Sequence, residues 1–219
     1  MKSRKYDLLV FDWDGTLIDS AATIVACLKA ASCDLDLPEP TDQSARHVIG
    51  LGLDEALAHL WPGLLPESGR ALVERYRHYF LSRDHDIPLF PHVSDGIKGL
   101  YEDGFLLAVA TGKSRRGLDR SLEATGLASY FHGTRCADES FSKPHPGMLL
   151  DLMGALGTRP GRTLMIGDTT HDLKMAENAR VASLAVSYGA HAEQGLLAHS
   201  ALGCMRDFAE VSAWLTANA

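Results

Sequence analysis

Two aspartates follow a short apolar segment near the N-terminus. Asp12 and Asp14 come after residues 8–11, within the sequence DWDGT. In an open α/β sheet the ligand crevice lies at the carboxyl ends of the strands, so this position favours a role in chemistry. In strand geometry the two side chains would point the same way and repel each other, and a divalent cation would offset that repulsion. Alone, the motif also fits a solvated turn with an aspartate N-cap.

Three further polar groups follow later apolar segments. Thr111 and Gly112 would place a hydroxyl and a free backbone N–H at a helix start, where phosphate oxygens can bind. Lys143 lies in KPHP, and the prolines would hold it on a stiff loop. Asp168 and Asp172, in GDTTHD, are spaced to face one side of a helical turn. Each group alone also fits an ordinary turn or surface side chain, but hard carboxylates without a Cys or His cluster favour Mg²⁺ over zinc.

The elements that must position these residues alternate along the chain. Segments that are apolar at consecutive positions are typical of strands buried on both faces of a parallel sheet. They are residues 8–11, 105–110, 164–166 and 182–186. Helical spacing follows at 113–124, stopped by Gly126, and at 169–179. This order of β-α units predicts an α/β fold with a doubly wound parallel sheet.

Residues 20–86 interrupt the alternation, because they contain no convincing strand. Helical spacing is present at 21–33, 53–60 and 67–82, and Asp19 or Ser20 is a candidate N-cap for the first of these helices. We therefore predict a small helical domain inserted after the first strand. The predicted boundaries are 1–18 plus 88–219 for the catalytic core and 19–87 for the helical cap.

The composition excludes several classes of protein. The 219 residues are 46% hydrophobic and 22% charged, which is typical of a chain that buries a core. A net charge of −7 lacks the basic surface that nucleic acids and anionic membranes attract, although a local site can still bind phosphate. No apolar stretch reaches the length of a secretory signal or a membrane span, and the four cysteines form no C-x-x-C pair. We expect a cytoplasmic protein, monomeric or dimeric, with reduced thiols.

The order of the motifs resembles the haloacid dehalogenase superfamily. FDWDGTLIDS, TGK, KPHP and GDTTHD look most like its phosphoglycolate phosphatase-type branch, and the resemblance runs from Tyr6 to about Gly189. It implies a Rossmann-like core with a helical cap. It also implies a Mg²⁺-dependent phosphatase that hydrolyses a small phosphorylated metabolite, a phosphoglycolate-like phosphomonoester, through an aspartyl-phosphate intermediate.

The resemblance implies catalytic roles for the matching residues. Asp12 would be the nucleophile that attacks phosphorus. Asp14 would protonate the leaving oxygen and then deprotonate the water that hydrolyses the intermediate. Thr111, with Gly112 beside it, and Lys143 would hold the phosphoryl oxygens, and Lys143 would offset the negative charge around the nucleophile.

The resemblance also implies a magnesium site. Asp12, the carbonyl of Asp14 and Asp168 would bind the ion, while Asp172 would act through water or hold Lys143. The electrostatics agree independently, because an anionic nucleophile cannot approach a phosphate dianion unless cations neutralise the crevice.

The cap would select the substrate. In such enzymes a cap loop closes over the core, and Arg46 or His47 could meet an anion there, although Arg46 is equally compatible with a solvated helix residue. Lys113, Arg115 and Arg116 would widen the positive field at the crevice or be solvated, and we expect at least one of them to be solvated. Arg180 departs from the superfamily pattern, where a glycine ends this helix, so we expect a different helix end or a strained backbone angle.

Several alternatives share these motifs. An inorganic pyrophosphatase and a phosphosugar mutase would use the same core residues. A halocarboxylate dehalogenase has no need for an acid/base at Asp14. Outside the enzymes, an inactive scaffold or binding member would not need all six motif residues, which are Asp12, Asp14, Thr111, Lys143, Asp168 and Asp172.

Overall fold

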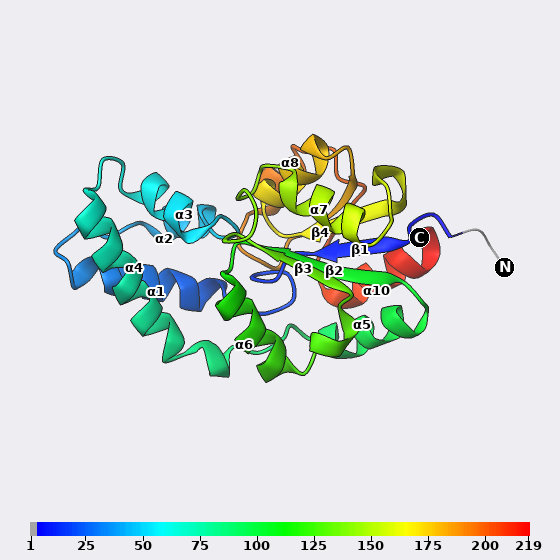
Figure 1. Ribbon diagram of the computed structural model, residues 1–219, viewed down its shortest axis with the longest axis horizontal. Coiled ribbons are helices and arrows are strands. Elements are labelled where there is room, and N and C mark those ends of the chain that lie inside the picture. The colour runs from blue at the N-terminus through cyan, green and yellow to red at the C-terminus, as the bar shows by residue number, and fades with distance from the viewer. Residues whose placement is uncertain (1–3) are drawn as a thin grey trace.

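A six-stranded parallel sheet forms the centre of the fold in the computed structural model, which describes residues 4–219 (Figure 1). The strand order is β3-β2-β1-β4-β5-β6. The strands are β1 Leu8–Phe11, β2 Leu106–Thr111, β3 Gly133–Cys136, β4 Thr163–Gly167, β5 Ala182–Val186 and β6 Cys204–Met205. The predicted doubly wound α/β sheet is confirmed, because helices cover both of its faces.

Alternation along each strand divides the core between the two faces. Leu9 and Phe11 pack with the helices α5 (Val93–Glu102), α6 (Arg115–Thr125) and α10 (Phe208–Asn218). Leu8 and Val10 pack with α7 (Gly147–Ala155) and α8 (Thr170–Asn178) on the other face. A short helix α9, Glu193–Leu196, follows β5. Burial on both faces explains why these strands are apolar at consecutive positions.

The insertion after β1 is helical, as its spacing indicates. It contains α1 (Ala21–Cys33), α2 (Asp42–His47), α3 (Leu53–Leu60), α4 (Pro66–Leu81) and a 3₁₀ turn at Asp84–Asp86. Leu28, Leu57 and Leu72 are buried in an apolar cluster that these helices share. Figure 1 shows the insertion beside the carboxyl-terminal edge of the sheet rather than on either face.

The two connections to the insertion run side by side. Ile18 forms an antiparallel bridge with Leu89, Asp19 N–H donates to the Pro88 carbonyl at 2.9 Å, and Phe90 N–H donates to the Leu17 carbonyl at 3.0 Å. The chain therefore enters and leaves the insertion through one pair of adjacent segments.

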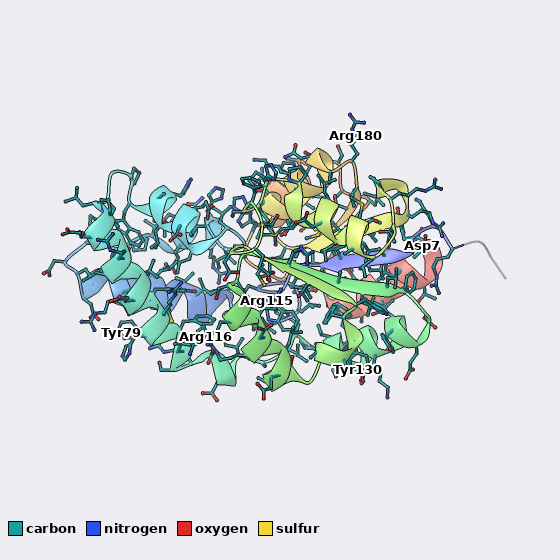
Figure 2. The ribbon with its side chains drawn as sticks, viewed as in Figure 1. Asp7, Tyr79, Arg115, Arg116, Tyr130 and Arg180 are labelled. Atoms are coloured by element: carbon teal, nitrogen blue, oxygen red, sulfur yellow. The ribbon has the colours of Figure 1, made fainter. Side chains whose placement is uncertain are left out.

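Helix α6 has regular caps at both ends, whereas α8 ends in an unusual backbone conformation. Ser114 accepts a hydrogen bond from Gly117 N–H at the start of α6, and Gly126 ends that helix with φ 68°. Arg180 follows α8 with φ 57°, in the left-handed region where glycine is the usual residue, so the second of the two expectations for it is right. Its side chain projects away from the sheet (Figure 2). Over residues 4–219, no helix is both long and apolar enough to cross a bilayer.

Candidate active site

The motif residues meet at the carboxyl edge of the sheet. β1 is paired with β2 on one side and with β4 on the other, in registers that align Phe11 with Val109 and with Ile166. The polar groups that follow these strands therefore share one edge. The chain order turns back between β1 and β4, which is the switch point where open α/β sheets bind ligands.

A lysine lies between two buried carboxylates at this edge. Lys143 Nζ is 2.7 Å from Asp12 Oδ1 and 2.7 Å from Asp172 Oδ1, and none of the three side chains is accessible to solvent. Burial alone would lower the pKa of Lys143, but the two carboxylates raise it above its ordinary value, so the ammonium stays charged. Of the two roles expected for Asp172, its position here fits the one in which it holds Lys143.

Asp172 is also fixed by its own helix. Its Oδ2 accepts hydrogen bonds from the Thr169 backbone N–H at 3.1 Å and from the Thr169 hydroxyl at 2.6 Å. This is a capping box at the start of α8. Both oxygens of Asp172 are therefore engaged, one by the cap and the other by Lys143.

Asp168 is held from two sides. Thr16 Oγ1 donates to its Oδ1 at 2.8 Å, and Ala190 N–H donates to its Oδ2 at 2.7 Å. A Cβ added at Gly15 or at Gly189 would lie 2.2 Å from Asp168 Oδ2, so both positions require glycine for this close approach. The Asp168 side chain is thus held by two hydrogen bonds and by the backbone at Gly15 and Gly189, which packs closely against it.

The site carries more negative charge than its protein cation balances. Burial, together with the charges of Asp172 and Asp168, raises the pKa of Asp12 well above its ordinary value despite the attraction of Lys143. Burial and the charge of Asp172 raise the pKa of Asp168 to about 7, against its hydrogen bonds with Ala190 and Thr16. A further cation in the crevice would keep both groups ionised.

The donor atoms fit a hard divalent cation. Asp12, Asp168 and Asp172 each offer a carboxylate oxygen, and these oxygens lie within 4.8 Å of one another. Asp12 Oδ2 is buried, and it has no hydrogen-bond partner among residues 4–219, whereas Oδ1 pairs with Lys143. An unsatisfied carboxylate oxygen in an all-oxygen group is what Mg²⁺ binds.

Asp14 lies at the boundary between the sheet and the insertion. Its Oδ1 accepts a hydrogen bond from the Ser20 hydroxyl at 2.7 Å and is 3.1 Å from Lys113 Nζ. Ser20 occupies the N-cap position of α1, as expected, but its hydroxyl serves Asp14 rather than the helix. Lys113 Nζ also lies 4.5 Å from the centre of the Phe80 ring on α4. This lysine is therefore part of the site and is not a solvated helix charge.

A cavity of about 470 Å³ opens from Asp14 between the insertion and the sheet. Gly112 and Lys113 line it from the sheet side, and Tyr76 and Phe80 line it from α4. Arg116 also lines it, whereas Arg115 is tied to Glu139, with Nη2 2.7 Å from Oε2. Figure 2 labels both arginines at the start of α6, beside the insertion. Thr111, at the end of β2, is buried, and its Oγ1 accepts a hydrogen bond from Lys113 N–H at 3.2 Å.

Arg46 and His47 lie elsewhere. They form the last turn of α2, and neither is among the described residues that line the cavity. The His47 carbonyl accepts hydrogen bonds from His171 Nε2 at 2.7 Å and from His191 Nε2 at 3.1 Å. The expected contact of Arg46 or His47 with substrate gains no support from this geometry and stays a prediction.

The three histidines form a joint between the insertion and the core. Their rings lie together, but His191 accepts Thr170 N–H at its Nδ1, so its Nε2 carries the proton that goes to the His47 carbonyl. With both nitrogens in use, His191 does not offer a free lone pair to a metal. A second contact of the same joint is Gly52 N–H, which donates to the Ser142 hydroxyl at 2.8 Å, next to Lys143.

Comparisons with known proteins identify a family and several relatives of this chain. The model of the family described as haloacid dehalogenase-like hydrolase matches residues 9–186. The chain is 38% identical over 213 residues to a Dickeya dadantii protein named "Probable phosphatase IndB", covering 93% of this chain and 91% of that protein. It is 31% identical over 199 residues to a phosphoglycolate phosphatase of Vibrio vulnificus strain YJ016, covering 86% and 87%. The crystal structure of a hydrolase from Pseudomonas syringae superposes with a TM-score of 0.89 at 22% identity, covering 97% and 98%.

Proposed function

Because the chain belongs to the haloacid dehalogenase-like hydrolase family, we propose that it is a Mg²⁺-dependent phosphatase that hydrolyses a small phosphorylated metabolite. The observation that carries the proposal is the buried group in which Lys143 lies between Asp12 and Asp172, while Asp12 Oδ2 has no hydrogen-bond partner among the described residues. The names of the relatives, a phosphatase and phosphoglycolate phosphatases, support it. The group combines carboxylates with a charged lysine. This combination suits a phosphoryl dianion, because an anionic nucleophile can approach it only where cations offset the negative charge.

Asp12 is the proposed nucleophile. Its carboxylate attacks phosphorus, the bond from phosphorus to the leaving oxygen breaks, and an aspartyl-phosphate forms. Asp14 gives a proton to the leaving oxygen and then takes one from the water that attacks the intermediate, which releases inorganic phosphate and restores Asp12. Ser20 and Lys113 orient Asp14 for both steps.

Lys143, Thr111 and Gly112 are the proposed phosphoryl-binding groups. Lys143 is buried and charged, and Thr111 and Gly112 end the neighbouring strand at the same edge. Asp12, Asp168 and the carbonyl of Asp14 would hold Mg²⁺, which when bound supplies positive charge to the phosphoryl oxygens. We propose that the helical insertion acts as a cap that excludes water when it lies against this edge.

The test is metal-dependent phosphate release. Chelation with EDTA should abolish hydrolysis of p-nitrophenyl phosphate, and Mg²⁺ should restore it, because the crowded carboxylates need a cation to remain ionised around a dianionic substrate. The Asp12→Asn variant should lose several orders of magnitude in kcat while keeping its fold, and Asp151→Asn, at a half-exposed ion pair with Arg135, should keep full activity. Full turnover after exhaustive chelation would overturn the proposal.

Inorganic pyrophosphate and hexose phosphates belong in the same assay. An inorganic pyrophosphatase or a phosphosugar mutase would use the same core residues, so the identity of the released product separates these functions from a phosphomonoesterase. Preferred release from pyrophosphate, or isomerisation without release, would replace the proposed activity.

A further inference from the structure

The cavity lies almost entirely on the leaving-group side of the site. Its lining includes Asp14 and Gly112 but, among the described residues, neither Asp12 nor Lys143. Asp14 is the group that would protonate the leaving oxygen. The volume of about 470 Å³ is therefore space for the part of the substrate beyond that oxygen.

The wall that the insertion contributes is apolar and aromatic. Ile24 and Leu28 of α1 and Tyr76 and Phe80 of α4 line it. The Tyr76 and Phe80 rings, one helical turn apart, stack with centroids 5.7 Å apart and an interplanar angle of 22°. They provide a broad, preformed surface of the kind that binds a flat ring through packing and edge contacts.

The cavity is also lined by polar side chains, which include Asp54 and Glu55 of α3, Arg77 of α4 and, on the core side, Lys113, Arg116 and Asp138. The Tyr76 hydroxyl makes no hydrogen bond to any described residue, and burial keeps its phenol protonated by raising the pKa well above its ordinary value. Arg77 and Arg116 line the cavity and form no ion pair within residues 4–219, whereas Arg120 is paired with Asp84 at 3.2 Å. A cavity that combines an apolar aromatic wall with hydrogen-bonding side chains is suited to a ring-bearing organic ligand.

Glycolate would use this space poorly. The cavity could hold on the order of fifteen water molecules at their liquid volume, far more than a two-carbon acid displaces. A glycolate carboxylate would pair with Arg77 or Arg116, but its two carbons would leave most of the apolar surface of Tyr76 and Phe80 uncovered. A ring would instead bury apolar surface against apolar surface.

We propose that this cavity selects phosphomonoesters whose leaving group carries an aromatic ring or a flat heterocycle, with hydrogen-bond acceptors on the ring that meet Tyr76, Arg77 or Arg116. The inference rests on the proposed phosphatase function. It assigns Tyr76 and Phe80 to substrate selection, in place of the α2 residues that the sequence suggests.

The test compares esters that differ in the ring but little in leaving-group chemistry. Benzyl phosphate and ethyl phosphate both release a simple alcohol of similar basicity, and phosphoglycolate is the third substrate. We expect kcat/KM for benzyl phosphate to exceed that for ethyl phosphate by roughly tenfold to a hundredfold, the gain from burying one ring. Phosphoglycolate should rank with ethyl phosphate.

Substitutions on α4 test whether its aromatic residues cause the preference for benzyl phosphate over ethyl phosphate. Tyr76→Ala should lower the benzyl-to-ethyl ratio of kcat/KM at least several-fold, and Tyr76→Phe, which keeps the ring, should retain it. Tyr79→Ala is the matched control, because Tyr79 lies on the same helix outside the cavity lining and its hydroxyl donates to Asp34 Oδ2 at 2.9 Å. Figure 2 shows it on the side of α4 away from α6. This control should leave the ratio unchanged.

The outcomes separate the two proposals. Equal kcat/KM for the benzyl and ethyl esters, a preference for phosphoglycolate, or an unchanged ratio in folded Tyr76→Ala would overturn ring selection and leave the phosphatase function standing. No phosphate release from any of the esters, p-nitrophenyl phosphate included, would overturn the phosphatase function and ring selection together.

Discussion

At the scale of single residues, two lysines place positive charge beside different aspartates of the site. Lys143 offsets the charge of Asp12, the proposed nucleophile, from within the core, with contacts of 2.7 Å to Asp12 and to Asp172. Lys113 contacts Asp14, the proposed acid/base, and its Nζ lies over the Phe80 ring of the insertion. The second lysine therefore connects the proton-transfer group to the part of the molecule that would move.

The Lys113→Met variant should separate the effect of the Lys113 charge on Asp14 from the packing of its stem on Phe80. Methionine keeps an apolar stem over Phe80 but removes the charge that holds Asp14, so we expect kcat for p-nitrophenyl phosphate to fall at least about tenfold with little change in melting temperature. Lys98→Met, at an exposed ion pair on α5, is the control. Unchanged kcat in Lys113→Met would show that the lysine only packs against the insertion.

The motif residues could be predicted from sequence because their spacing fixes them to strand ends. Asp12, Thr111 and Asp168 needed only the rule that chemistry lies at the carboxyl edge of a parallel sheet. Ser20 and Tyr76 could not be predicted as parts of the site, because their roles depend on how the insertion folds back. A serine at a helix start and a tyrosine within an amphipathic helix carry no local signal of either contact.

At the scale of elements, the backbones of the insertion and the core lie close together at the end of β2. A Cβ added at Gly112 would lie 2.3 Å from the Leu51 carbonyl oxygen and 2.7 Å from that of Gly50. Both contacts are to backbone, which cannot rotate away. The segment after α2 is therefore in van der Waals contact with the proposed phosphoryl-binding corner.

Gly112→Ala should keep the insertion from closing against the core. We expect kcat/KM to fall about a hundredfold, since a displacement of the order of 1 Å in an active site costs that much. Gly99→Ala on α5, where an added Cβ meets nothing within 4 Å, is the matched substitution and should be active. Normal activity in Gly112→Ala would mean that this contact is not needed for turnover.

The histidine joint predicts a pH dependence of stability. Burial and the charge of His171 lower the pKa of His191 to about 4, from 6.5 in the unfolded chain. Between pH 6.5 and pH 4 the unfolded chain takes up a proton on His191 that the native protein does not. The free energy of unfolding therefore keeps its full value above pH 6.5 and falls as the pH drops from 6.5 towards 4. At pH 5 the loss is about 2 kcal/mol.

His191→Gln isolates that contribution. Glutamine can accept Thr170 N–H and donate to the His47 carbonyl but does not titrate, while the buried carboxylates act equally in both proteins. Urea unfolding at pH 7 and pH 5 should show the wild-type protein losing about 2 kcal/mol more than the variant. Parallel losses would show that His191 is not held neutral by the joint.

Not every element was predictable. β1 and β5 match their apolar segments residue for residue, and α3 matches its helical spacing. β3 was not predicted, because an edge strand of sequence GTRC has no apolar run, and β6 has only two residues. α2 was not predicted as a helix either, since its one buried residue, Ala45, leaves no apolar periodicity to detect.

At the scale of the whole molecule, the fold separates chemistry from selection. The sheet edge holds the charged groups that would act on phosphorus, and the insertion supplies most of the apolar wall that the leaving group would meet. The paired segments at Ile18 and Leu89 join the two parts. This arrangement lets one family of core residues serve different esters through changes confined to the insertion.

The central claim is that Asp12 becomes phosphorylated, and the Asp14→Asn variant tests it most directly. p-Nitrophenolate leaves without a proton from Asp14, but the intermediate then lacks the base that activates water, so it should accumulate. After mixing with p-nitrophenyl phosphate, we expect a burst of one equivalent of p-nitrophenol. Acid quenching and peptide mass spectrometry should then find one added HPO₃ group on Asp12, absent when Asp12→Asn is combined with Asp14→Asn. Phosphorylation of another residue, or no adduct under conditions where the wild-type protein turns over, would contradict the mechanism.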